Sequence, residues 1–159
     1  AKRHELCLFG DLQCSSQVGS ITKFKNFSLL CPNEREARIA MQDKDSGLER
    51  LCNKLIKITK AKRLIMKLGA DGFIAYDRNE EENLISQSFP ALSVNPVDVA
   101  GAGDSLLALM STGLAIKQPM RRTAALGCFI TSLAVETMGN VPISNVALKH
   151  AVELMYKNQ

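Results

Sequence analysis

The segment from Asp98 to Ser105 carries the residue types best suited to chemistry in this chain. It reads Asp-Val-Ala-Gly-Ala-Gly-Asp-Ser and lies between an extended segment and a long apolar run. A glycine-rich loop that enters a helix lets the backbone approach a ligand and presents unpaired N–H groups to an anion. Asp104 follows, where a carboxylate beside a phosphoryl group can accept a proton from an attacking hydroxyl. On spacing alone, the ordinary interpretation is a tight turn at Gly101–Gly103 with Asp104 or Ser105 as a helix cap.

Two stretches nearer the start of the chain place polar residues and glycines after apolar runs. Asn33 and Glu36 follow one run, and an Asn with a Glu three residues later is also an ordinary helix-capping pattern. Lys67, Gly69 and Gly72 follow another run, where glycines commonly mark a turn. No Gly-Lys-Ser/Thr follows the glycine-rich loop and no G-x-G-x-x-G opens a helix after a strand, which excludes a P-loop and a dinucleotide fingerprint.

Taken in order, the three stretches resemble the ribokinase-like family of carbohydrate kinases, of the phosphofructokinase-B type. The C-terminal signature of that family is Asp-Thr-x-Gly-Ala-Gly-Asp before a buried helix of small residues, and Asp98–Asp104 match every position except Val99. The resemblance implies that Asp104 is the general base. It also implies an anion hole for the transferred phosphoryl group, made by the backbone of Gly101, Ala102 and Gly103.

The resemblance further implies residues that bind the nucleotide and the ions. The Asn33 stretch resembles the family's Pro-Asn-x-x-Glu element, which organises the phosphates and Mg²⁺ partly through water, so Glu36 is an indirect magnesium residue. The Lys67 stretch resembles the strand ending in Thr-x-Gly-x-x-Gly that lines the nucleotide. Residues 134–140 resemble the segment that borders the adenine pocket and, in many members, a monovalent-cation site, which makes Asp98 a candidate ligand for K⁺. The implied nucleotide-binding residues are Asn33, Lys67, Gly69, Gly72 and Cys128.

Three residues depart from the family pattern. Val99 replaces the usual Thr and removes its hydroxyl. Lys67 stands where Thr is common. Its ammonium reaches a nucleotide phosphate as a point charge, or its apolar stem lies along the protein surface while the ammonium stays in water. Cys128 stands where Asn or His often borders the purine, and packing in the core is its ordinary interpretation. None of these departures touches Asp104.

Alternating strands and helices must position these residues. Short apolar runs bounded by turn residues predict strands, their alternation with helices through residues 6–68 predicts parallel βαβ units, and residues 73–88 predict an edge hairpin. The predicted fold class is α/β, a doubly wound, mostly parallel sheet with flanking helices, as in the C-terminal portion of a ribokinase-like fold. The predicted strands are Leu6–Phe9, Ser28–Cys31, Leu64–Leu68, Phe73–Tyr76 and Leu84–Ser88.

Four helices complete this prediction. Apolar residues at helical spacing over residues 48–56, after the capping-box pattern Ser46-x-x-Glu49, predict an amphipathic surface helix. Similar spacing over residues 147–155 predicts a last helix with Ser144 as its N-cap.

The other two helices are predicted around the apolar middle of the second half. Residues 101–117 are apolar nearly all round, which predicts a buried helix. Pro119 suits the first turn of a further helix that runs to about Glu136.

Composition excludes several classes of function. The chain has 159 residues, of which 46% are hydrophobic and 23% charged, so we expect a globular protein with one sizeable core. Its net charge of +4 comes from basic residues mixed with acids, and it has no Trp, which argues against nucleic acid as a partner. Five cysteines without a Cys-x-x-Cys pair argue against a disulfide framework and a zinc site and favour a reducing cytoplasm. No apolar run reaches the roughly 20 residues of a membrane span, and no secretory signal opens the chain.

The resemblance extends over the whole chain, which we expect to be one folding unit, residues 1–159. This unit corresponds to the C-terminal, nucleotide-binding half of a sugar kinase, so the N-terminal half, which supplies most sugar contacts and the lid, is the missing partner. The beginning at Ala1 rather than Met agrees with a longer protein. Residues 11–17 and 99–104 resemble the heptose-phosphate kinase branch. A homodimer stays open.

The leading hypothesis is therefore ATP-dependent phosphorylation of a sugar or sugar-phosphate hydroxyl, with Mg²⁺ and K⁺ as the implied ions. Without its other half the chain is expected to be inactive, because catalysis of this kind depends on positioning and electrostatics. The competing hypothesis is a non-catalytic nucleotide- or phosphate-binding module, such as a degraded kinase paralogue. A third alternative is an α/β core with an accidental motif.

Overall fold

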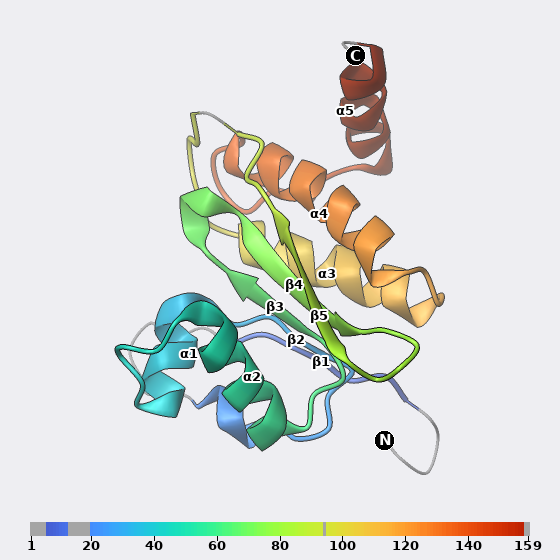
Figure 1. Cartoon of the computed structure of the whole chain (residues 1–159). Helices are drawn as coiled ribbons and strands as arrows, with labels where there is room; N and C mark the ends of the chain where they lie inside the picture. Colours follow the sequence, from blue (N-terminus) through green and yellow to red (C-terminus); the bar gives the residue numbers. More distant parts are fainter. Residues whose placement is uncertain (1–5, 13–19, 94, 158–159) are drawn as a thin grey trace. The chain divides into compact units, whose positions relative to one another are not determined.

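The computed structural model describes residues 6–12, 20–93 and 95–157 (Figure 1). The chain divides into two compact units, one made of residues 1–69 and 73–88 and the other of residues 70–72 and 89–159. The first unit contains the sheet and the second contains three long helices. The expectation of a single folding unit over residues 1–159 stays a prediction.

The first unit contains a five-stranded sheet in the order β1-β2-β3-β4-β5. β1 (Phe9–Gly10), β2 (Leu29–Leu30) and β3 (Leu64–Lys67) run parallel to one another. β4 (Phe73–Arg78) runs antiparallel to β3, and β5 (Leu84–Phe89) is the neighbour of β4 in this order. The sheet is therefore mixed, as parallel units followed by a hairpin require.

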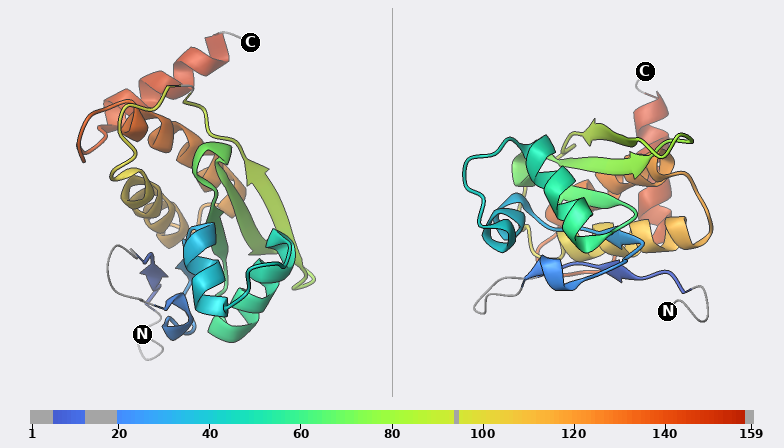
Figure 2. Two further views of the ribbon diagram at one scale, coloured as in Figure 1. Left: turned by 90° about the vertical axis from the view of Figure 1, so that its left-hand side faces the viewer. Right: turned by 60° about the horizontal axis from the view of Figure 1, so that its bottom comes forward.

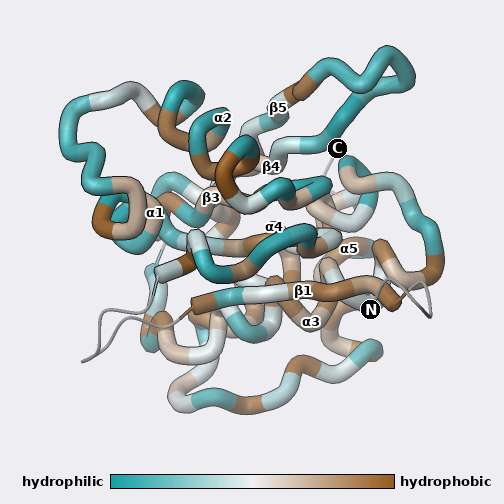
Figure 3. The backbone as a smooth tube through the Cα atoms, turned by 90° about the horizontal axis from the view of Figure 1, so that it is seen from below, coloured by the Kyte–Doolittle hydropathy of each residue, from teal (hydrophilic) through white to brown (hydrophobic). Residues whose placement is uncertain are grey.

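Two helices and a short 3-10 turn supply the remaining core of the first unit. These are α1 (Glu34–Met41), α2 (Leu48–Thr59) and η2 (Ile21–Lys23). Along α2 the colours of Figure 3 change between teal and brown, as expected of a helix with one polar and one apolar face. The buried cluster comprises Ile21, Leu30, Ala37, Leu51, Cys52, Leu55, Ile56, Ala61, Leu64, Met66 and Tyr76.

The second unit is built from α3 (Ala102–Ala115), α4 (Met120–Val135) and α5 (Asn145–Lys157). α3 packs against α4, and α4 packs against α5, as the two views in Figure 2 show. The first two helices approach closely at Gly113, where a Cβ atom would lie 2.5 Å from Cγ2 of Thr123. In the described ranges, every helix is too short or too polar to cross a membrane.

The helix ends test the predicted caps. The predicted capping box at Ser46 is wrong, because α2 has Gly47 as its N-cap with no side-chain cap. The backbone N–H of Ser46 instead donates to Oδ1 of Asp43 at 3.0 Å, so Ser46 belongs to the turn before the helix. At α5 the predicted cap is confirmed, since Oγ of Ser144 accepts the N–H of Ala147 at 3.1 Å.

Two further predictions differ from the structure in detail. β1 covers Phe9–Gly10 rather than Leu6–Phe9. The prediction of a buried helix over residues 101–117 is wrong for most of the surface of this helix, because α3 buries one stripe at a spacing of four residues. The rest of the helix mixes apolar side chains with small and polar ones, and it includes the exposed Asp104 and Thr112. The buried stripe is Leu106, Met110 and Leu114.

Candidate functional site

The glycine-rich loop of the second unit leads directly into α3. Gly101 is the N-cap of this helix and has a φ of +77°, a left-handed conformation that glycine adopts without the steric cost other residues meet. Ala102 and Gly103 form the first turn, and Asp104 follows within that turn. The side chain of Asp104 is exposed and forms no hydrogen bond or ion pair with any residue that the structure describes. The predicted base and anion-hole residues are therefore contiguous; the Asp104 side chain is exposed, whereas the N–H of Ala102 donates to the carbonyl of Val99 at 3.4 Å.

Asp98 ties this loop to the segment that follows α4. Its Oδ1 accepts the N–H of Ala100 at 2.9 Å, and its Oδ2 accepts the N–H of Gly139 at 3.0 Å. These two donors hold the pKa of the Asp98 carboxyl below its ordinary value, because they stabilise the charged form. The carbonyl of Val135 also accepts the N–H groups of Val97 and Asp98, at 2.7 and 3.1 Å. Residues 97–98 are thus hydrogen-bonded both to the end of α4, at Val135, and to Gly139 beyond it.

The side chain of Asn140 packs against the glycine-rich loop at Gly101. A Cβ atom at Gly101 would lie 2.2 Å from Oδ1 and 2.6 Å from Cγ of Asn140, distances that no real contact allows. Glycine is therefore favoured at position 101 for two reasons: the left-handed backbone conformation, and the Asn140 side chain, which would have to move to admit a Cβ atom.

In the first unit, Asn33 and Glu36 form a complete capping box at the start of α1. Oδ1 of Asn33 accepts the N–H of Glu36, and Oε2 of Glu36 accepts the N–H of Asn33, both at 2.8 Å. Glu36 is buried, with 5% of its surface exposed. The ordinary interpretation of this stretch, a helix cap, is therefore confirmed. Any role of Asn33 and Glu36 toward phosphates and Mg²⁺ would come in addition to capping.

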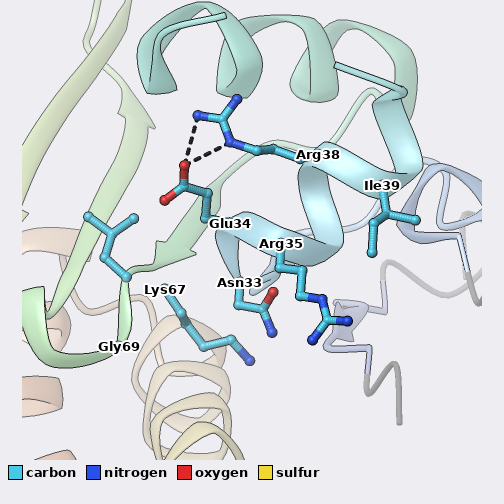
Figure 4. A pocket seen from close by; sticks show the side chains of 8 residues that line it. Asn33, Glu34, Arg35, Arg38, Ile39, Lys67 and Gly69 are labelled. Atoms are coloured by element: carbon cyan, nitrogen blue, oxygen red, sulfur yellow. Dashed lines mark hydrogen bonds and ion pairs between the residues drawn. The ribbon is translucent and has the colours of Figure 1, made fainter. Parts of the chain in front are cut away.

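Lys67 and Gly69 line the same pocket as Asn33 (Figure 4). The pocket has a volume of about 520 Å³ and lies entirely within the first unit. The last residue of β3, Lys67, is held by its backbone N–H, which donates to the carbonyl of Pro32 at 2.9 Å. Its ammonium forms an ion pair with Oδ2 of Asp11 at 2.5 Å. The side chain is thus already paired within the protein.

The two glycines that follow β3 differ in their surroundings. Both are left-handed, with φ of +63° at Gly69 and +86° at Gly72. A Cβ atom at Gly69 would meet nothing within 4 Å, whereas one at Gly72 would lie 2.1 Å from the carbonyl oxygen of Phe89. Gly69 therefore leaves open space beside the pocket, and Gly72 permits a close backbone approach.

Cys128 lies within α4 and is 5% exposed. Its Sγ lies 3.7 Å from the carbonyl of Ala124, one turn earlier in the helix, and burial raises the pKa of its thiol. This burial favours core packing over contact with a purine.

Metal binding is limited by the donors available. In the described part of the chain, no cluster of three or more His, Cys, Asp or Glu side chains could hold a metal ion. Mg²⁺ keeps several waters and binds through one or two carboxylates plus substrate phosphates, so Glu36, which keeps one carboxylate oxygen outside the capping box, fits an indirect role. Both oxygens of Asp98 accept backbone N–H groups, so a monovalent cation there would have to use the remaining lone pairs.

Three residues near these sites were not predicted from the sequence. Asp11 pairs with Lys67 across 56 positions, and Asn140 covers Gly101 across 39, so no local pattern could reveal either contact. Arg35 lines the pocket from within the Asn33 stretch, where a basic residue beside a phosphate-type motif was an available signal.

Solved structures of sugar kinases share this fold. Ribokinase from Thermotoga maritima superposes with a TM-score of 0.79 at 21% identity, and the match covers 96% of this chain and 50% of that protein. Phosphofructokinase-2 from Escherichia coli, in complex with potassium, gives 0.77 at 20% identity, covering 98% and 49%. Arabidopsis thaliana ribokinase, complexed with ribose and ATP, gives 0.74 at 21% identity, covering 97% and 49%. The predicted α/β class with flanking helices and the ribokinase-like fold are confirmed.

Sequence comparison narrows this class to a family. The pattern described as pfkB family carbohydrate kinase matches residues 16–145, and the chain belongs to that family. Among curated relatives, bifunctional protein HldE from Desulfatibacillum aliphaticivorans is 29% identical over 131 residues, which is 80% of this chain and 26% of that protein. Ribokinase from Schizosaccharomyces pombe is 29% identical over 115 residues, 69% of this chain and 35% of that protein. The chain thus spans about a quarter to a third of the length of these curated relatives.

Proposed function

We propose that this chain is the nucleotide-binding part of an enzyme that transfers the γ-phosphoryl group of ATP to a hydroxyl of a sugar or sugar phosphate. The observation that carries the proposal is the position of Asp104, exposed in the first turn of α3 and directly after a loop that begins at the left-handed Gly101. Membership of the carbohydrate kinase family supports the same reaction.

In this reaction Asp104 takes the proton from the sugar hydroxyl. The hydroxyl oxygen forms a bond to the γ-phosphorus, the bond from that phosphorus to the β,γ-bridging oxygen breaks, and ADP leaves. The N–H groups of Gly101, Ala102 and Gly103 lie at a helix N-terminus, where negative charge on the phosphoryl oxygens is stabilised. Catalysis of phosphoryl transfer depends mostly on positioning and electrostatics. The loop amides are proposed to supply the electrostatic stabilisation, and Asp104 to accept the proton.

The nucleotide is proposed to bind along Asn33, Lys67 and Gly69 of the first unit. The shared pocket of these three residues supports this part of the proposal. For Gly72, a nucleotide-binding role stays a prediction from the sequence. ATP is also the nucleotide in the solved ribokinase from Arabidopsis thaliana. Bound Mg²⁺ would neutralise phosphate charge, with Glu36 orienting it through water. K⁺ at Asp98 and a purine contact at Cys128 remain proposals, although the burial of Cys128 weighs against the latter.

The chain alone is proposed to be inactive. It spans about half the length of the solved sugar kinases it resembles, so contacts that orient the sugar and exclude water have to come from elsewhere. We therefore propose that it works with the N-terminal half of the same kinase.

The test uses the full-length protein with a panel of sugars and sugar phosphates, heptose phosphates included. Asp104→Asn keeps the size of the side chain and removes the base, so turnover is expected to fall about 100- to 10 000-fold while ATP still binds. The matched control is Asp45→Asn, because Asp45 is exposed and forms no bond with a described residue. A wild-type protein that binds ATP and phosphorylates none of the panel favours the non-catalytic binding module. Equal turnover in wild type and Asp104→Asn removes Asp104 from the role of base.

A further inference from the structure

The pocket of the first unit is lined by three cationic side chains, and two of them already have partners. Arg38 donates from Nε to Oε1 of Glu34 at 2.8 Å, and its Nη1 reaches three backbone carbonyls at 3.0 to 3.3 Å. Lys67 is paired with Asp11, and the two side chains are only 20% and 10% exposed. Each of these cations is balanced by a carboxylate within the protein.

Arg35 is the third cation of the pocket. Arg35 is exposed and lies in the first turn of α1, and its guanidinium forms no hydrogen bond or ion pair with any residue in the described ranges. Figure 4 shows the side chains of Asn33, Arg35 and Lys67 extending to one side of the pocket, while the paired Glu34 and Arg38 extend to the other. The pocket therefore has one polar side on which an amide and two cations gather.

The polar side of the pocket carries a net positive charge. Asp11 neutralises Lys67, so Arg35 leaves a net charge of about +1 facing the pocket. A guanidinium presents a planar fork of N–H donors that matches the oxygens of a phosphate, and bonds of this kind are stronger than those between neutral groups. The charge and the donor geometry together favour a polyphosphate.

We propose that Arg35 is a further nucleotide-binding residue, which contacts the phosphates of ATP in this pocket and favours the triphosphate over nucleosides. This inference rests on the proposed function, because it takes the nucleotide to lie against Asn33 and Lys67. Lys67 acts from a position fixed by Asp11, and Arg38 braces the loop after α1 through its carbonyl contacts.

The test compares Arg35→Gln, Arg35→Lys and wild type in the full-length protein, with three probes: ATP, adenosine and inorganic tripolyphosphate. Arg50→Gln is the matched control, since Arg50 is an exposed Arg on α2 without a partner among the described residues. We expect Arg35→Gln to raise Kd about tenfold or more for ATP and tripolyphosphate and to leave adenosine unchanged. Arg35→Lys should recover part of the loss, because a point charge replaces the fork.

Several outcomes overturn the inference. These are an unchanged Kd for ATP in Arg35→Gln, an equal loss for adenosine, or an equal loss in Arg50→Gln, which would indicate only the general charge of the surface. Failure of the proposed function is seen separately, as the absence of sugar phosphorylation by wild type. In that case the tripolyphosphate measurement still decides whether Arg35 binds a polyphosphate, and loss of that role as well rejects both proposals.

Discussion

Replacing Gly101 by Ala tests how the anion-hole loop is held. Gly101 and Gly139 belong to the same unit and have nearly equal φ values, +77° and +78°. They differ in their surroundings, because a Cβ atom at Gly139 would meet nothing within 4 Å, whereas one at Gly101 would overlap Asn140. Gly139→Ala is therefore a control for the cost of the backbone conformation alone.

The expected magnitudes follow from these distances. A left-handed conformation costs an L-residue roughly 1–2 kcal/mol, and this cost is common to both substitutions. At Gly101 the added methyl group would lie 2.2 Å from Oδ1 of Asn140. Because Asn140 is exposed, its side chain can rotate away, and the additional cost is about 1 kcal/mol, at the low end for overpacking. Gly101→Ala should therefore lower the free energy of unfolding by about 1 kcal/mol more than Gly139→Ala does.

The assay is urea unfolding of the full-length protein, with midpoints compared at a common slope to avoid the error of long extrapolation. Asn140→Ala completes a double-mutant cycle, because it removes the Oδ1 and Cγ atoms and leaves only the Cβ, at 3.3 Å. In the Asn140→Ala background, Gly101→Ala should cost no more than Gly139→Ala. Equal costs for the two glycine substitutions in the wild-type background, or a cycle without coupling, would refute the reasoning that Asn140 holds Gly101.

Two other substitutions have defined outcomes. Thr59→Val should destabilise the protein by about 1–3 kcal/mol in urea unfolding. The buried hydroxyl donates to the carbonyl of Leu55 at 2.7 Å and accepts the N–H of Ala61 at 3.3 Å, and Val would leave the N–H of Ala61 without this acceptor. An unchanged midpoint would contradict this. The lowered pKa of Asp98 means that its carboxylate stabilises the fold above the ordinary Asp pKa of about 3.9 and that this stability is lost as the pH falls. The difference in unfolding free energy between wild type and Asp98→Asn should accordingly be largest at neutral pH and become smaller below about pH 4. A difference that does not change with pH would contradict a stabilising role for the Asp98 carboxylate.

Much of the fold could be predicted because its signals are local. The apolar stripe of α2 and the short apolar runs of β3, β4 and β5 follow directly from periodicity and turn residues. The predicted cap of α2 was wrong because two local patterns competed. At the start of α2, Asp43 takes the N–H of Ser46, and Gly47 becomes the N-cap instead.

In the candidate site, too, the residues of local motifs could be predicted and the contacts between distant residues could not. The loop of residues 101–104 and the capping box of Asn33 and Glu36 are contiguous in sequence, so residue type and spacing were enough to indicate them. The Asp11–Lys67 ion pair and the contact of Asn140 with Gly101 join residues far apart in the chain, and a single sequence contains no signal for either.

These distant contacts change how the predicted residues are interpreted. Lys67 was predicted either to reach a phosphate or to bury its stem, and its ion pair with Asp11 shows a third arrangement, a cation fixed at the end of β3. Once that charge is balanced, a nearby cation without a partner is the side chain that can select an anion. The charges around the pocket therefore favour Arg35 over Lys67 as the side chain that selects an anion, because the structure shows that Lys67 has a partner and Arg35 has none among the described residues.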